Sequence, residues 1–542
     1  MPDKSKFRIV VPDGDLLTYL LPPEDHGDGD QRLWIDAEDT SRYITRLGTL
    51  QWVKSLSVAF QRMGVRVGDV VLMFSPNHIY VPPAYIGTVA HGAVFTAASP
   101  ASTTREVTMQ LQQTKAKAIL VHPSLAKTAI SAANAAVLPL ERLYLFSDRP
   151  SKPVAGLEDL WSILGCPSEI ENWRAPEVNR DQRQRQACVI NFSSGTTGMP
   201  KGVCISQANL IANSEQSIYV RSLEKNVDAP DQLSDRWLGF LPLYHAFGQV
   251  FSIVLSCRLG IPVYVMKKFR YESFLQHIQN HSITGFTTAP PVLVMLNKRP
   301  ETASYDLSSL KEIVCGAAPL SKELQTSLSR RLNVRIRQTY GGTELTCSST
   351  GIPGGMDDIT GSVGVLYPNM ECKLLDKAGH EVGTGIPGEA YMKGPNVCLG
   401  YWQNEQATRD AIDRDGFYRT GDILVKDERG MYYVLDRIKE MIKVNGLQVV
   451  PAELEAVLLQ NHDVADAAVV GVPWSQEERP RAYVVLKPHA KGKISSVNLR
   501  DWVAKRVAKH KRLEGGIIFV DAIPKSPTGK IQRNLVRNWS RL

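Results

Sequence analysis

The chain has 542 residues, of which 43% are hydrophobic and 22% are charged, values that exclude a largely disordered protein and leave room for several domains. Its 8 cysteines are spread singly without a Cys-x-x-Cys pair, so neither a zinc cluster nor a disulfide framework is indicated, and a reducing compartment is expected. The net charge is +8, but no recognised nucleic-acid motif accompanies it, so nucleic acid is not an expected partner.

The first 320 residues alternate helical patterns with short β-rich runs, which predicts a parallel α/β sheet. The opening residues are too polar for a signal segment. The longest apolar stretch, 251–266, is broken by Arg258 and Pro262, so it predicts a buried helix-to-strand segment and no membrane span. The expected strand-bearing ranges are 67–77, 85–100, 116–124, 237–248, 260–269, 282–296 and 310–320.

Near residue 360 the sequence pattern changes to short β-rich runs separated by glycine turns, which indicates a small β-barrel or distorted sheet. After residue 446 come a helix, two strands and a second helix, which form a compact α+β unit. We therefore expect a large N-terminal domain of α/β subdomains plus a small β-barrel, residues 1–435, and a small mobile α+β C-terminal lid domain, residues 436–542.

Charge supports this division. Residues 436–542 carry 19 Lys and Arg against 11 Asp and Glu, whereas residues 1–435 carry 44 of each. The simplest interpretation is a solvated basic face. The functional alternative is a domain that meets a polyanion such as a nucleotide or coenzyme A.

The stretch SSGTTGMPKG, residues 193–202, has the composition of a phosphate cradle. Its glycines allow backbone N–H groups to turn inward, its hydroxyls donate hydrogen bonds, and Lys201 supplies a positive charge. It is not a G-x-x-x-x-G-K-[ST] loop, because Gly202 follows the lysine. Taken alone, a Ser/Thr/Gly run also fits a flexible loop.

Three further short segments have residues suited to nucleotide binding and catalysis: QTYGGTE (338–344), YRTGD (418–422) and PKSPTGKIQR (524–533). In the first, an aromatic ring can stack on a base and Glu344 can hold Mg²⁺. Asp422 can accept hydrogen bonds from the ribose hydroxyls. Lys530 lies on a Pro/Gly loop, and movement of that loop can bring the lysine ammonium to the site or withdraw it. Each segment alone also fits an ordinary turn.

Together with PLYHAFG, GAAPL and LDRIKEMIKVNGLQVVPAELE, these motifs resemble, over nearly the whole chain, the adenylate-forming superfamily of acyl-CoA synthetases, 4-coumarate–CoA ligases and beetle luciferases. The resemblance implies a hinged lid and a two-step reaction. A carboxylate attacks the α-phosphate of ATP to give acyl-AMP and pyrophosphate, and the thiol of coenzyme A then displaces AMP.

The resemblance also implies site residues. Those that cradle the phosphates are Ser193, Ser194, Gly195, Thr196, Thr197 and Lys201. Those that hold adenine and the α-phosphate are Ala317, Gln338, Thr339, Tyr340 and Thr343. Glu344 is implied as the Mg²⁺ ligand, Asp422 and Arg437 as ribose ligands, and Lys530 as the catalytic lysine of adenylation.

For the second step, the resemblance implies that the lid rotates about Lys439 and presents its other face. Lys443 is then the catalytic group on that face. The residues implied to bind coenzyme A are Lys268, Asn445, Gly446 and Gln448. The segment departs from the common QGYGMTE motif at two positions: Thr339 replaces a glycine and Gly342 replaces a methionine. Neither replacement removes a charge.

The acyl pocket is implied at His245, Phe247, Phe251, Ala317 and Gly341. A lone histidine is often structural, but the motif favours His245 as a gate for the substrate. No acidic residue in this neighbourhood could pair with an ammonium group, which disfavours amino acids. Two phenylalanines indicate an apolar aryl acid, of the cinnamate or phenylacetate kind, or a medium-chain alkyl acid.

Two other functions remain open. The chain could load its acyl group onto a separate carrier protein, or it could be a catalytically silent nucleotide-binding module, although the retained Lys530 and Glu344 argue against the latter. The sequence ends in Ser540, Arg541 and Leu542, which resembles the peroxisomal address S-K-L. We therefore expect recognition by the peroxisomal import receptor, and otherwise a cytoplasmic location.

Overall fold

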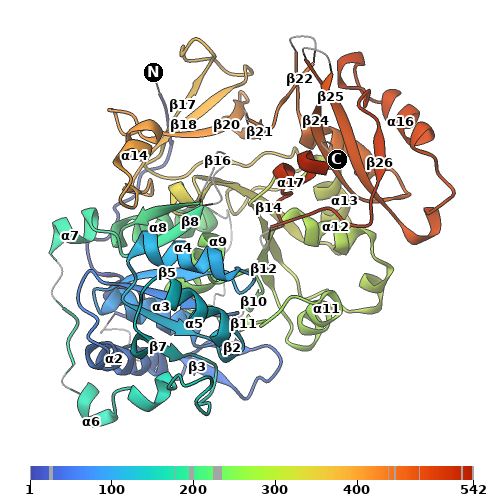
Figure 1. Ribbon diagram of the computed structural model, residues 1–542. Helices are drawn as coiled ribbons and strands as arrows, with labels where there is room; N and C mark the ends of the chain where they lie inside the picture. The colour runs from blue at the N-terminus through green and yellow to red at the C-terminus, as the bar shows by residue number, and fades with distance from the viewer. Residues whose placement is uncertain are drawn as a thin grey trace.

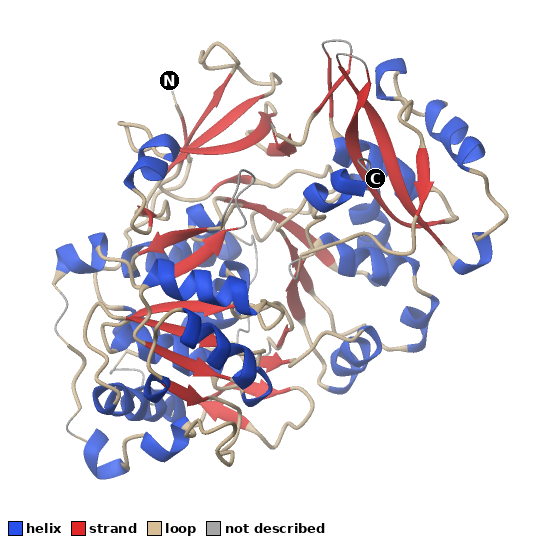
Figure 2. Ribbon diagram, in the orientation of Figure 1, coloured by secondary structure: helices blue, strands red, loops and turns tan. Residues whose placement is uncertain are grey.

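The computed structural model describes residues 2–22, 29–171, 173–176, 179–193, 200–223, 235–437, 439–444, 447–474, 477–526 and 529–539. Three sheets build the large domain, and a separate lid contains the C-terminal elements (Figure 1). Helices flank the strands throughout the large domain (Figure 2). This is the mixed α/β architecture with a small C-terminal domain that the sequence predicts.

The first sheet is mostly parallel and buried on both faces. Its central strand reads VVLMF, the continuous apolar run that such a position requires. Val70, Leu72 and Phe74 pack with α4 and α5, while Val71 and Met73 join the core that contains α2 and α3. In sheet order the strands are β19 (Gly400–Tyr401), β9 (Lys201–Ile205), β8 (Val189–Ser193), β5 (Val94–Ala98), β4 (Val70–Phe74), β6 (Ala118–Val121) and β7 (Leu143–Leu145).

The second sheet has nine strands and supplies the strand ends around which the site is built. The same large core joins it to the first sheet. In order its strands are β16 (Val365–Leu366), β15 (Thr350–Gly351), β14 (Arg335–Tyr340), β13 (Glu312–Cys315), β12 (Gly285–Thr288), β10 (Trp237–Gly239), β11 (Val263–Val265), β2 (Arg32–Asp36) and β3 (Tyr43–Thr45).

The described helices of the large domain connect and cover these sheets. They are α1 (Leu16–Leu20), α2 (Arg46–Arg62), α3 (Val81–Ala90), α4 (Thr104–Thr114), α5 (Ala126–Ala135), α6 (Pro167–Ile170), α7 (Arg180–Arg185), α8 (Gln207–Ser222), α9 (Ala246–Gln249), α10 (Ser256–Leu259), α11 (Tyr271–Asn280), α12 (Pro290–Lys298), α13 (Lys322–Leu332) and α14 (Glu405–Ala411). The apolar stretch 251–266 forms a buried π-helical segment (Val250–Leu255), α10 and β11, which confirms the predicted helix-to-strand segment. No described helix is both long enough and apolar enough to cross a bilayer.

The third sheet is antiparallel and lies where the sequence suggested a small β-barrel. In the described residues it is a five-stranded sheet with β1 and β21 at its two edges, so of the two expected forms, a small β-barrel or a distorted sheet, the structure has the sheet. Closure into a barrel needs the edges to pair, and β1 pairs with β17 whereas β21 pairs with β20. The strands are β1 (Asp3–Lys4), β17 (Glu371–Leu375), β18 (Gly388–Lys393), β20 (Tyr418–Lys426) and β21 (Tyr432–Arg437).

The lid has its own hydrophobic core, formed by residues from Ile442 onward. The boundary expected at Asp436 falls in the last two residues of β21, and the turn at Lys439 and Glu440 follows. The lid elements are β22 (Ile442–Val444), β23 (Leu447–Val449), α15 (Pro451–Gln460), β24 (Val464–Trp474), β25 (Glu477–Leu486), α16 (Ser496–Ala504), β26 (Ile517–Phe519) and α17 (Arg533–Trp539).

The lid rests against the α12 side of the second sheet (Figure 1). The Lys298 ammonium at the end of α12 donates to the Val464 carbonyl of the lid at 2.6 Å. A Cβ built on Gly529, whose φ is +83°, would lie 3.1 Å from Pro291 at the start of α12. Position 529 therefore favours glycine, because any other residue would strain the backbone and crowd Pro291. The close approach also shows that the loop with Lys530 packs against the large domain.

Candidate active site

A buried carboxylate, Asp422, connects the second and third sheets. Its Oδ2 accepts a hydrogen bond from the Tyr340 hydroxyl at the end of β14, at 2.7 Å. Its Oδ1 accepts from Arg437 Nε at 3.1 Å, across the β20–β21 pair. Burial raises the pKa of Asp422, and Arg437 and Tyr340 oppose that rise. Because each carboxylate oxygen has two lone pairs, the side chain keeps the capacity to accept two ligand hydroxyls.

A second carboxylate, Glu344, lies in the turn that follows β14. Its Oε1 accepts hydrogen bonds from the Ser193 hydroxyl at 3.0 Å and the Tyr401 hydroxyl at 3.1 Å. Among the described residues, Oε2 accepts no hydrogen bond. One anchored and one free carboxylate oxygen is a donor set that fits Mg²⁺, which commonly takes one or two carboxylates and completes its shell with water and phosphate oxygens.

The ends of the predicted phosphate loop meet at this carboxylate. Ser193 ends β8 and Lys201 begins β9, and the two residues face each other in the antiparallel pair. Lys201 Nζ lies 5.0 Å from the centroid of the Tyr401 ring, within cation–π range. The predicted residues between these ends lie outside the described residues: Ser194, Gly195, Thr196 and Thr197.

Gln338 and Thr339, expected to hold the nucleotide, direct their side chains into the framework. The Gln338 amide donates to Gln325 Oε1 at 2.9 Å, and the Thr339 hydroxyl donates to the Thr350 carbonyl at 2.7 Å. Gln325 in turn donates to the Asp358 carbonyl at 2.7 Å. In this arrangement Gln338 and Thr339 shape the site through their backbone positions.

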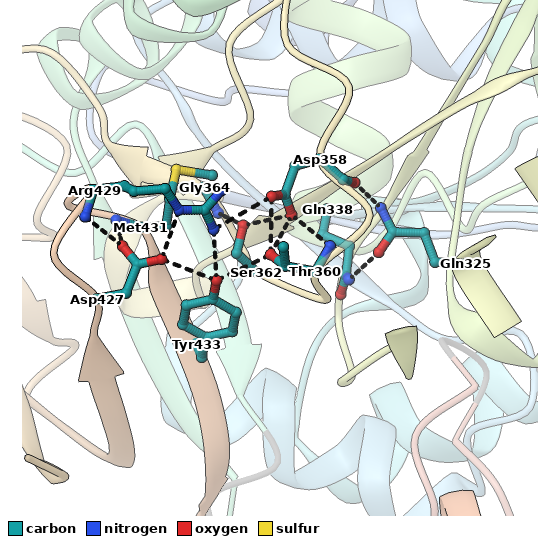
Figure 3. A network of polar contacts seen from close by, with 10 residues as sticks. All are labelled: Gln325, Gln338, Asp358, Thr360, Ser362, Gly364, Asp427, Arg429, Met431 and Tyr433. Carbon is teal, nitrogen blue, oxygen red and sulfur yellow. Dashed lines mark hydrogen bonds and ion pairs between the residues drawn. The ribbon is translucent and has the colours of Figure 1, made fainter. Parts of the chain in front are cut away.

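Asp358 extends that framework to the third sheet (Figure 3). Its carboxylate accepts from the hydroxyls of Thr360 and Ser362, at 2.8 and 2.9 Å. The Thr360 hydroxyl lies 2.9 Å from that of Tyr433 on β21, which also receives a hydrogen bond from Arg429. The buried network therefore links β14, which bears Gln338, to the strand that leads into the lid.

Two residues near the site have left-handed backbones that a side chain normally avoids. Ala317, after β13, has φ +69°, and Thr346, after the turn Thr343–Leu345, has φ +63°. The Thr346 hydroxyl donates to the Asn396 carbonyl, and its N–H donates to the Thr343 carbonyl, so local contacts hold the conformation. Strained residues of this kind concentrate at functional sites.

His245 caps α9, and its ring Nδ1 accepts from the Phe247 N–H at 3.3 Å. Burial lowers the pKa of His245 to about 4, and the charge of Lys530 acts in the same direction. The ring is therefore neutral at pH 7, and because Nδ1 accepts, its proton is on Nε2. Phe247 and Phe251, on successive turns, contact edge to face with centroids 5.1 Å apart.

A cavity of about 30 Å³ lies beyond Phe251 and Thr339. Its other lining residues include Trp237, Tyr367 and an ionic group of Arg221, Glu312 and Arg337. Arg221 Nε lies 3.5 Å from Glu312 Oε2, and Arg337 also pairs with Glu312. This cavity, which Phe251 lines and Phe247 does not, is therefore small, and its carboxylate Glu312 already has cationic partners.

The structure brings the lid residue Lys530 to this site. Burial and the neighbouring Arg437 lower the pKa of Lys530, while Asp422 and Glu344 oppose that change. The loop is closed by two contacts with Ser526, which donates to the Lys530 carbonyl and accepts from the Lys530 N–H. The lid thus places Lys530 within the electrostatic reach of Asp422, Arg437 and Glu344, as the resemblance implies for adenylation.

The residues expected to serve the second step lie elsewhere. The Lys443 side chain is exposed on β22, and the Lys443 backbone N–H donates to the Glu478 carboxylate. Lys268 is exposed in the segment after β11. Lys439 is exposed in the turn between β21 and β22, and its carbonyl accepts from Arg537. Asn445, Gly446, Ser540, Arg541 and Leu542 lie outside the described residues, and nothing is described of the Gln448 side chain.

Sequence reasoning missed Tyr401, Gln325 and Asp358. Tyr401 ends the two-residue strand β19 and carries no motif of its own, although its hydroxyl donates to Glu344. Gln325 lies on α13 and Asp358 in a loop, and both act on β14 through contacts distant in sequence. No local pattern signals such partners.

Comparison with known proteins gives the chain its family. The family described as AMP-binding enzyme matches residues 28–402, and the AMP-binding enzyme C-terminal domain matches residues 453–530. A probable 4-coumarate–CoA ligase 2 of Dictyostelium discoideum is 33% identical, over 98% of this chain and 97% of its own. The phenylacetyl-CoA ligase epaB of Aspergillus niger is 34% identical, over 99% and 98%.

Solved structures share the fold. The anthranilate CoA ligase AuaEII, in complex with anthranoyl-AMP, has a TM-score of 0.84 at 23% identity and covers 98% of each chain. ATP-bound MatB from Rhodopseudomonas palustris has a TM-score of 0.82 at 24% identity, over 97% of this chain and 99% of its own. Both likenesses extend over the large domain and the lid.

Gly341 and Gly342 give a matched pair of predictions. A Cβ on Gly341 would collide with the Cys347 carbonyl and lie 2.7 Å from Ser348 Cα, whereas one on Gly342 would meet only Glu344 Oε2, at 3.7 Å. Gly341→Ala should lower the free energy of unfolding by about 2 kcal/mol because backbone must move. Gly342→Ala, at an extended φ of −163°, should leave it within about 0.5 kcal/mol. Equal effects in chemical denaturation would contradict the crowding argument.

The pKa of His245 predicts how stability depends on pH. Between pH 6.5 and 4 the unfolded chain protonates this ring while the folded chain does not, so the folded state loses stability as pH falls. By pH 5 the loss amounts to on the order of 2 kcal/mol. His245→Asn retains a capping acceptor but cannot titrate. The difference in unfolding free energy between His245→Asn and the parent should therefore shift by that amount in favour of the variant from pH 7 to pH 5. If the two proteins lose stability in parallel over this range, the low pKa of His245 is contradicted.

Proposed function

The chain belongs to the family of AMP-binding enzymes, and on that basis we propose that it is an ATP-dependent acid–CoA ligase. A carboxylate oxygen attacks the α-phosphorus of ATP, the bond to the β-phosphate breaks, and pyrophosphate leaves. The thiolate of coenzyme A then attacks the acyl carbon, and AMP leaves. A carboxylate is a poor electrophile, so conversion to a mixed anhydride is what makes the second step possible.

The observation that carries the proposal is the position of Lys530 beside Asp422, Arg437 and Glu344. Negative charge develops on the α-phosphate and the departing pyrophosphate, and a fixed ammonium stabilises it. Asp422 and Arg437 orient the nucleotide, and Tyr340 is held beside them by its hydrogen bond to Asp422. Mg²⁺ bound at Glu344 Oε2 would neutralise phosphate charge.

Thioester formation uses the other face of the lid. Lys443 projects from β22, on the far side of the turn at Lys439, and the lid must turn about that point to bring it to the acyl-adenylate. The lid's excess of 8 positive charges supports contact with the phosphates of both ATP and coenzyme A. Adenylation and thioester formation then alternate by lid rotation.

The acyl group we propose is an apolar aryl acid. Phe247 and Phe251, in edge-to-face contact, supply an apolar wall for it. The relatives named as 4-coumarate–CoA and phenylacetyl-CoA ligases support this class. A medium-chain alkyl acid remains the second candidate, because the same rings can pack against methylene groups.

A coupled assay tests the function and the substrate class together. AMP release is measured with Mg²⁺ and ATP across cinnamate, 4-coumarate, phenylacetate, hexanoate and longer acids, with and without coenzyme A. We expect cinnamate or phenylacetate to lead and a thioester to appear in mass spectra. Adenylate that accumulates regardless of coenzyme A would point to a carrier-protein acceptor, and no AMP with any acid would support the silent module.

Two lysines of one loop provide the decisive variants. Lys530→Ala should lower the rate of acyl-adenylate formation at least about 100-fold, because the developing phosphate charge loses its ammonium partner. Lys525→Ala removes only an ion pair with Asp466 at 2.6 Å within the lid and should leave that rate within about threefold. Equal losses would show that loop stability, not charge at the phosphate, explains the effect.

The peroxisomal location expected from Ser540, Arg541 and Leu542 stays a prediction. It rests on the likeness of the tripeptide to S-K-L and on the charge that arginine shares with lysine.

A further inference from the structure

Three potential metal ligands meet at one end of the lid, away from the site described above. His462 and Asp463 immediately precede β24, and His489 lies in the turn Pro488–Ala490 that follows β25. Val464 pairs with Leu486 in the antiparallel ladder, so the two segments lie side by side. We propose that His462, Asp463 and His489 form a binding site for a divalent transition-metal cation, with zinc as the expected occupant.

The ligand atoms already have the spacing of a tetrahedral site. Asp463 Oδ1 lies 3.3 Å from His462 Nδ1 and 3.2 Å from His489 Nε2, and all three ligand atoms lie within 4.8 Å of one another. Ligands held about 2.0–2.1 Å from Zn²⁺ at tetrahedral angles are about 3.3–3.4 Å apart. The two distances from Asp463 to the histidines therefore match a tetrahedral site. Rotation of the exposed imidazole rings can bring the two histidine nitrogens to the same distance from each other.

The backbone holds the central carboxylate in place. The Asp463 N–H donates to Asn461 Oδ1 at 2.9 Å, and its carbonyl accepts from the Lys487 N–H at 2.8 Å. The histidine turn is closed by the Ala490 N–H, which donates to the Lys487 carbonyl at 3.0 Å. The metal would thus meet ligands carried by ordered backbone, and binding would cost mainly the ordering of the three side chains.

The chemistry of the set favours zinc over magnesium or calcium. Two imidazoles and one carboxylate suit zinc and its neighbours in the first transition series, whereas magnesium and calcium prefer oxygen ligands. The side chains of His462, Asp463 and His489 are 81%, 34% and 51% exposed, so a water can take the fourth position. The ammonium of Lys487 lies on the same strand end and opposes a cation, which predicts moderate affinity.

Occupation of this site would act on the lid's contact with the large domain. The carbonyl of Val464, next to Asp463, accepts the hydrogen bond from Lys298 of α12. Burial lowers the pKa of Lys298 to about 8, the charge of Lys487 acts in the same direction, and Asp466 opposes it. A bound dication adds to that charge, at a site separate from the nucleotide.

Calorimetric titration of Zn²⁺ into the tag-free full chain, without nucleotide, tests the proposal. All proteins carry Cys166→Ser, because Cys166 is the exposed thiol among the cysteines and could bind zinc itself. We expect one equivalent to bind, and His462→Ala or His489→Ala to weaken binding at least about tenfold. Co²⁺ should give the visible absorption of a tetrahedral site, and lose it in both variants.

His380→Ala is the matched control, because His380 forms a similar exposed pair with Asp376, at 3.7 Å, but has no second histidine in the cluster. It should bind Zn²⁺ like the parent. Unchanged affinity in both His462→Ala and His489→Ala would overturn the proposal and leave the trio as a hydrogen-bonded cluster only. Circular dichroism confirms that each variant is folded, and binding is measured without reference to ligase activity.

Discussion

The ion pair between the buried Asp422 carboxylate and the partly exposed Arg437 is the interaction on which the active site depends. Asp422 belongs to the third sheet, its hydroxyl partner Tyr340 ends a strand of the second sheet, and Arg437 is the last residue of β21 before the hinge turn. An unpaired carboxylate at this depth would cost several kcal/mol, so the two sheets and the start of the hinge are held in one geometry. The nucleotide groups and the lid are positioned relative to that point.

The lid reaches the ion pair through a second cluster of charges. Arg533, three residues after Lys530, donates to Glu440 at 2.6 Å and to Glu455 at 2.7 Å. Glu440 lies in the hinge turn and Glu455 on α15, so α17, the hinge and the lid core are tied together. The residues after the Lys530 loop are therefore anchored to the hinge turn and to the lid core, so a rotation of the lid as proposed would carry that loop with it.

Much of this architecture could be predicted from local sequence. The run VVLMF signals a strand buried on both faces, and the glycine and hydroxyl residues after Phe192 signal a phosphate loop whose ends, Ser193 and Lys201, are indeed opposed. The resemblance placed Asp422, Arg437 and Lys530 in one site, and the structure brings them together. What local sequence could not show are the particular side-chain and backbone contacts: Tyr401 on Glu344, Gln325 on Gln338, and the crowding of Gly341 by the backbone of Cys347 and Ser348. The first joins segments 57 residues apart, the second joins a helix to the strand that follows it, and the third depends on how one turn folds, so no residue pattern records them.

The charges of the site explain why the nucleotide and the lid depend on each other. With the lid in this orientation, Lys530 is half-buried and feels the charge of Arg437, and both its loss of solvent and that charge lower its pKa. A polyphosphate in the site would supply the missing negative charge and raise the pKa of Lys530 again. Under the proposed mechanism, the nucleotide would bind more tightly to this orientation than to one in which Lys530 is withdrawn, and that difference in affinity would shift the lid toward it. Departure of pyrophosphate would remove most of the added charge, so the electrostatics that seat the lid for the proposed adenylation would also release it for the proposed second step.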